Sequence, residues 1–120
     1  RKALRSLALT TDSSVISCVA NDYSYTEVFS RQLEAFGRDG AVLVAISTSG
    51  NSANILKVLE VAKSKNIFSV GLLGRDGGKA KEMTDLPIIV PSRTTARIQE
   101  IHGLIGHIIC DLIETELGYA

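Results

Sequence analysis

The stretch that decides the fold is residues 41–52, which reads AVLVAISTSGNS. An apolar run breaks into small hydroxyl side chains around Gly50, and a helical pattern follows. This junction is typical of a buried strand leading to a helix N-terminus, where free N–H groups and roughly half a positive charge favour an anion. The hydroxyls donate further hydrogen bonds, and Gly50 lets the backbone pass close to a ligand. We predict a site for a phosphate-sized anion. The alternative is a capped helix, because Ser, Thr and Asn also favour N-caps.

Composition limits the classes of function. A chain of 120 residues with 45% hydrophobic residues fits one compact domain with a core. The 13 Lys and Arg balance the 13 Asp and Glu, so no overall charge attracts nucleic acid or an anionic membrane. No apolar run reaches the ~20 residues of a membrane span, and Arg1-Lys2 does not lead into a signal peptide. Cys18 and Cys110 stand far apart without a CxxC pair, which predicts reduced core thiols in a soluble cytoplasmic protein.

Short apolar segments alternate with helical patterns along the chain. We predict strands at 6–10, 41–47, 68–73 and 86–90, and helices at 13–20, 26–36, 52 or 54 to 65, 79–83 and 95–117. This order predicts an α/β fold, a three-layer αβα sandwich with a mainly parallel sheet. Pro87 suits an edge strand.

Two further segments carry separate predictions. The GRDGG loop at 74–78 follows a strand at the edge where ligands bind in open α/β sheets. It lacks the spacing of a dinucleotide or nucleotide loop, so we interpret it as a flexible turn. Helix 95–117 has an apolar face wider than a surface helix requires, which suggests a subunit interface.

Several motifs together resemble a known family. They are STSGNSAN at 47–54, TTD at 10–12, Asn21-Asp22, FSRQ at 29–32, TARIQEIH at 95–102, and His107. This combination resembles the sedoheptulose 7-phosphate isomerase (phosphoheptose isomerase) family, which has the flavodoxin-like or Rossmann-like SIS (sugar isomerase) fold. The resemblance covers nearly the whole chain, and residues 1–120 correspond to the C-terminal two-thirds of the family's single domain.

The resemblance implies a cytoplasmic homotetramer with a sugar phosphate substrate and a zinc cofactor. Its reaction interconverts sedoheptulose 7-phosphate and D-glycero-D-manno-heptose 7-phosphate through an enediol. This is the first step of activated-heptose synthesis for lipopolysaccharide or other surface glycans.

The resemblance also assigns roles to residues. The phosphate-binding hydroxyls correspond to Ser47, Thr48, Ser49 and Ser52. Asn21 and Asp22 correspond to sugar contacts, and Gln99 and His107 to two of four zinc ligands. His107 is also the expected acid/base catalyst.

The front of the family's domain has no counterpart in these residues. An N-terminal helix, an Asn-Gly-Gly-Ser loop, and a helix with the other zinc ligands, a His and a basic Glu, are all missing. We therefore expect an incomplete site within residues 1–120. Either the sequence omits a disordered front segment, which is the preferred interpretation, or the molecule is truncated.

The spacing on the last helix leaves several alternatives open. Gln99 and His107 are eight residues apart, about 12 Å along a helix axis at roughly 1.5 Å per residue. They could just share one ion, or serve sites in different subunits, or Gln99 could bind substrate instead. From the pattern alone, His107 could be a core histidine bonded to a carbonyl, and that interpretation is preferred for His102.

Two alternative functions belong to other classes. One is a non-catalytic SIS module that associates with the bacterial replication initiator, in which the counterpart of Ser49 is typically arginine and that of His107 is lost. The other is a domain that senses a sugar phosphate without turnover.

Overall fold

The computed structural model describes residues 2–119, and its elements follow the predicted alternation. In chain order they are α1 (Ser13–Asp22), the 3-10 turn η1 (Tyr25–Glu27), α2 (Ser30–Phe36), β1 (Val42–Ser47), α3 (Ala53–Ser64), β2 (Phe68–Gly74), α4 (Ala80–Met83), β3 (Leu86–Val90) and α5 (Thr95–Glu116).

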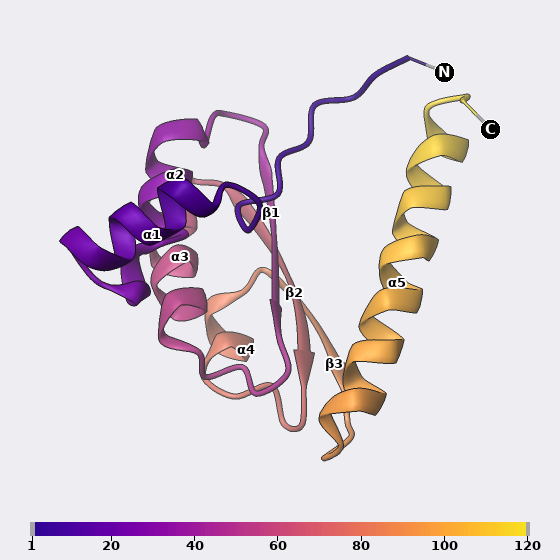
Figure 1. The fold of residues 1–120 in the computed structure, drawn as a ribbon. Coiled ribbons are helices and arrows are strands. Elements are labelled where there is room, and N and C mark those ends of the chain that lie inside the picture. Colours follow the sequence, from indigo (N-terminus) through magenta and orange to yellow (C-terminus); the bar gives the residue numbers. More distant parts are fainter. Residues whose placement is uncertain (1, 120) are drawn as a thin grey trace.

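The three strands form one parallel sheet in the order β1-β2-β3 (Figure 1). Val44 pairs with Val70, and Leu72 with Ile88. Because all strands point the same way, their carboxyl ends meet at one edge of the sheet. β3 is an edge strand of the sheet, as the position of Pro87 predicted.

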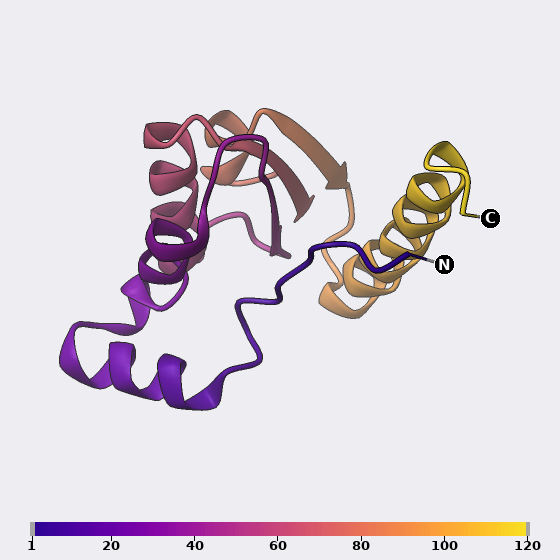
Figure 2. The same ribbon diagram turned by 90° about the horizontal axis from the view of Figure 1, so that it is seen from above.

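Helices lie on both sides of the sheet, which confirms the α/β class. Figures 1 and 2 show α1 to α4 on one side and α5 on the other. The core lies on the α3 side, where Leu43, Leu59 and Leu73 are buried among apolar neighbours. On the opposite side α5 buries only Ile98 and His102. The α3 side therefore supplies most of the apolar burial that holds the sheet in place.

Two predicted elements were wrong in type or extent. Residues 6–10 form no strand: residues 6–8 have no regular secondary structure, residues 9–10 form a turn, and the Leu9 carbonyl accepts a hydrogen bond from Gln32 Nε2 at 2.9 Å. The predicted helix 26–36 divides into η1 and α2. At the division, the Ser30 hydroxyl lies 3.2 Å from the Glu27 backbone carbonyl oxygen, to which it donates, and this local bond competes with helical hydrogen bonding.

The expectation of core thiols was also wrong. Cys18 and Cys110 are both exposed free cysteines, and neither is among the buried residues of its helix. Within residues 2–119, no helix has the length and apolarity that crossing a membrane requires.

Candidate functional site

The loop between β1 and α3 brings the predicted hydroxyls together, and we call residues 47–52 the hydroxyl loop. Ser47 is 6% exposed, and its Oγ accepts a hydrogen bond from Gly50 N at 3.1 Å and lies 3.3 Å from Ser52 Oγ. Ser52 occupies the N-cap position of α3, yet its side chain makes no capping hydrogen bond. Local capping therefore does not occupy this hydroxyl, and its hydrogen-bond partner among the described residues is the neighbouring Ser47 hydroxyl.

The hydroxyl loop packs directly against the glycine-rich loop that follows β2. Gly50 has a φ of +65°, and a Cβ added to it would lie 1.9 Å from the Gly77 carbonyl oxygen. Ala80 N donates to Gly50 O at 2.9 Å, and Lys79 N donates to Asn51 Oδ1 at 3.0 Å. The predicted flexible turn at 74–78 is therefore a tight turn held by contacts with the hydroxyl loop.

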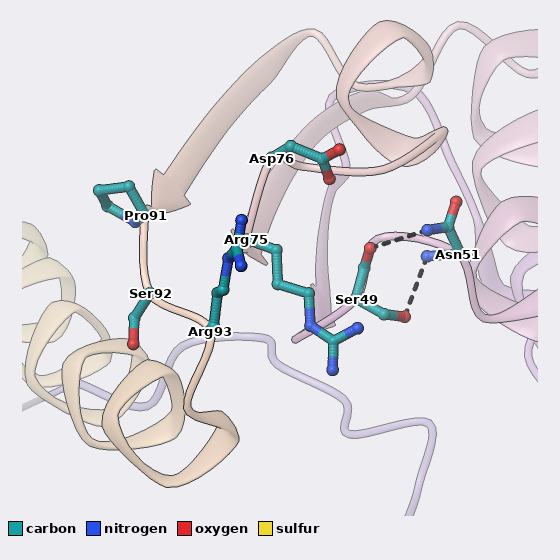
Figure 3. A pocket seen from close by; sticks show the side chains of 7 residues that line it. All are labelled: Ser49, Asn51, Arg75, Asp76, Pro91, Ser92 and Arg93. Atoms are coloured by element: carbon teal, nitrogen blue, oxygen red, sulfur yellow. Dashed lines mark hydrogen bonds between the residues drawn. The ribbon is translucent and has the colours of Figure 1, made fainter.

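A cleft of about 600 Å³ opens at the carboxyl ends of all three strands (Figure 3). Its walls are Ser49 and Asn51 after β1, Arg75 and Asp76 after β2, and Pro91, Ser92 and Arg93 after β3. Only Ser49 among the predicted site residues lines it. Sequence reasoning missed Arg75, Ser92 and Arg93, although their place just after predicted strands was a usable signal.

The predicted sugar contacts lie elsewhere. Asn21 and Asp22 are exposed in the last turn of α1, where Asn21 Nδ2 donates to Asp22 Oδ1 at 3.2 Å. Neither residue lines the cleft. Asp22 also accepts a hydrogen bond from Cys18 Sγ at 3.5 Å, and this bond to a carboxylate raises the pKa of the Cys18 thiol.

Helix α5 carries the remaining predicted residues. Gln99 and His107 are both exposed, so a core position bonded to a carbonyl is wrong for His107. That description fits His102, which is 5% exposed with its Nε2 2.8 Å from the Leu73 carbonyl oxygen. The core interpretation of His102 is therefore confirmed.

The described residues do not fit a zinc ion by themselves. Across residues 2–119, His, Cys, Asp and Glu side chains nowhere gather in a group of three or more that could hold a metal. A catalytic zinc usually has three protein ligands, whereas the two predicted ligands on α5, Gln99 and His107, supply one amide and one imidazole, both exposed. Any zinc site that uses Gln99 and His107 needs ligands from outside the described residues.

The parallel sheet and the hydroxyl loop at its carboxyl edge define the class of this protein. The model of the SIS domain family matches residues 1–74, and the chain belongs to that family. Within it, the chain is similar to phosphoheptose isomerases. It is 54% identical to the phosphoheptose isomerase of Clostridium acetobutylicum over 117 residues, which make up 98% of this chain and 60% of the relative. It is 55% identical to the phosphoheptose isomerase of Sulfurimonas denitrificans, again over 98% of this chain and 60% of the relative.

Solved structures show the same likeness. A phosphoheptose isomerase from Neisseria gonorrhoeae matches with a TM-score of 0.89 and 47% identity, over 91% of this chain and 61% of that one. One from Francisella tularensis matches with a TM-score of 0.93 and 38% identity, over 96% of this chain and 62% of that one. The chain thus spans about 60% of the length of the curated relatives it matches.

Proposed function

We propose that this chain belongs to a phosphoheptose isomerase that interconverts sedoheptulose 7-phosphate and D-glycero-D-manno-heptose 7-phosphate. The observation that carries the proposal is the hydroxyl loop at the start of α3, where no side chain caps the helix. The chain that holds this loop resembles such enzymes along nearly its whole length. Ser47, Thr48, Ser49 and Ser52 bind the phosphate in this proposal. The resemblance assigns sugar contacts to Asn21 and Asp22, which lie outside the cleft. Phosphate binding far from the reacting carbons then supplies the energy that positions them.

The reaction needs no external oxidant or reductant. A base removes a proton from the carbon next to the carbonyl, and the resulting enediol takes a proton back at the neighbouring carbon. A second proton moves between the two oxygens, so aldose and ketose balance atom for atom. We assign acid/base work to His107, because the family resemblance gives it this role and its imidazole is exposed.

We further propose that Gln99 and His107 contribute to a zinc site completed by groups outside the described residues. When bound, zinc supplies positive charge to oxygens that become negative in the enediolate. The proposal also includes a homotetramer, action in the cytoplasm, and supply of activated heptose for lipopolysaccharide or other surface glycans. Exposed apolar side chains on β1 and α5 support the self-association.

One observation favours a second candidate function, which is sugar-phosphate sensing without turnover. The hydroxyl loop is well formed, whereas the described residues gather no metal cluster of their own. Binding without chemistry would need only the first of these features.

Turnover of sedoheptulose 7-phosphate, with and without a chelator and added zinc, tests the proposal. We expect chelator-sensitive conversion to the aldose by the complete encoded polypeptide, which is the wild-type protein in every experiment below. Ser49→Ala should raise KM about tenfold, the usual cost of losing a hydrogen bond to a charged group. His107→Ala should lower kcat at least ~100-fold. Ser14→Ala, at an exposed position on α1, is the control.

Two other outcomes would contradict parts of the proposal. A folded wild-type protein that binds the sugar phosphate without turnover would contradict the isomerase and favour the sensor. Full activity in His107→Ala would remove its acid/base role.

A further inference from the structure

The hydroxyl loop leaves most of the ligand's charge uncompensated. A phosphate ester carries about −1.5 to −2 charges at neutral pH, while the sequence 47–54 contains no Lys or Arg. A helix start contributes only roughly half a positive charge. The chain has no net charge that could supply the remainder from a distance. Local cations are therefore needed for tight phosphate binding.

Two arginines line the same cleft as Ser49. Arg75 immediately follows β2, and Arg93 lies three residues after the end of β3. In Figure 3 the side chain of Arg75 extends toward Ser49, and that of Arg93 extends toward Arg75. The cleft thus places two guanidinium groups opposite the hydroxyl loop.

Both guanidinium groups are without protein partners in the part of the chain that the structure describes. Among residues 2–119, Arg75 and Arg93 make no ion pair and no side-chain hydrogen bond. Asp76 also lines the cleft, but its Oδ1 accepts a hydrogen bond from Gly78 N at 3.0 Å inside its own turn. Both arginines therefore keep their donors for a ligand, and each guanidinium can bind phosphate oxygens in a fork.

The backbone at Arg75 adds an independent observation. Its φ is +57°, a left-handed conformation that a residue with a Cβ adopts at a cost of roughly 1–2 kcal/mol. The tight turn against the hydroxyl loop keeps the backbone in this conformation. Such strained positions cluster where a side chain is held for a function.

We propose that Arg75 and Arg93 form a paired guanidinium site that binds the phosphate group from the side facing the hydroxyl loop. The inference rests on the proposed function, because the phosphate belongs to the sugar phosphate bound there. Two guanidinium charges match the charge of a phosphate dianion. The pair accordingly discriminates phosphorylated from unphosphorylated sugars.

Binding of inorganic phosphate at pH 7.5 tests the inference, measured by titration calorimetry on the wild-type protein and on Arg75→Gln and Arg93→Gln. We expect each substitution to raise Kd about tenfold or more, as expected for losing a charge-assisted pair. Arg93→Lys keeps the charge without the fork and should be intermediate. The control is Arg38→Gln, which removes the same charge at an exposed position outside the cleft and should leave Kd unchanged.

Turnover of sedoheptulose 7-phosphate separates this inference from the proposed function. Unchanged phosphate binding and KM in both glutamine variants, with wild-type turnover intact, would overturn the arginine pair and leave the isomerase standing. Arginine-dependent phosphate binding without wild-type turnover would support the pair and overturn the isomerase. No phosphate binding by the wild-type protein at millimolar concentrations would also overturn the pair.

Discussion

At the scale of single residues, Gly50 holds the hydroxyl loop against the turn that follows β2. We predict that Gly50→Ala lowers the free energy of unfolding by about 3 kcal/mol, from left-handed strain and overpacking together. The added Cβ would meet the Gly77 carbonyl oxygen at 1.9 Å, so one of the two loops must shift. Urea denaturation gives the stability, and calorimetry should show weaker phosphate binding.

A matched control separates strain from steric clash. Gly40 also has a positive φ, +77°, but an added Cβ there has no neighbour within 4 Å. Gly40→Ala should therefore cost only about 1 kcal/mol. Equal losses in the two variants would contradict the close contact between the loops.

Single residues of the site differ in how far the sequence could predict them. The hydroxyl loop was predictable because Ser47, Ser49 and Ser52 are neighbours along the chain and share one strand-to-helix junction. Arg75 and Arg93 were missed because they come from separate segments, and only the parallel pairing of β1, β2 and β3 brings them into one cleft. Motif spacing does not encode that proximity.

At the scale of elements, α5 is held to the sheet by few buried residues, and His102 is one of them. We predict that His102→Ala lowers the free energy of unfolding by about 3 kcal/mol, because it leaves a cavity and removes the donor facing the Leu73 carbonyl. Chemical denaturation measures the loss. His107→Ala, exposed on the same helix, should change stability by less than about 0.5 kcal/mol.

A conservative variant tests the hydrogen bond itself. His102→Gln keeps an N–H donor and should recover part of the stability lost in His102→Ala. Identical stabilities of the two variants would show that packing alone holds α5 at this point.

Predictions of elements succeeded where local pattern and tertiary context agree. Helix α3 has an apolar stripe at helical spacing, and β2 is almost continuously apolar, so both were predicted within a residue or two of their bounds. The predicted strand at 6–10 failed because a strand exists only with a hydrogen-bonding partner, and residues 6–10 pair with no strand of the sheet. The predicted helix 26–36 is divided just before Ser30, whose hydroxyl bonds to the Glu27 backbone carbonyl although the apolar pattern suits one helix.

At the scale of the whole molecule, the face of the sheet away from α3 leaves apolar side chains of β1 exposed. Val42, Val44 and Ile46 alternate with buried residues along β1 and are all exposed. Leu104, Ile108 and Leu112 are exposed on α5, which lies on the side of the sheet away from α3 (Figures 1 and 2). Groups of exposed apolar side chains mark interaction surfaces in soluble proteins. The broad apolar face predicted for this helix thus remains largely open in the single chain.

This surface leads to a prediction about assembly. We expect the wild-type protein to sediment as a tetramer at micromolar concentration, and Ile108→Lys and Val44→Lys to sediment as smaller species. Each position is 48% exposed in the single chain, so lysine is tolerated there but would carry an unpaired charge into an interface. Phe36→Lys is the control, since Phe36 is comparably exposed, at 57%, on α2 across the sheet. A monomeric wild-type protein, or a tetramer that persists in both lysine variants, would contradict self-association through this surface.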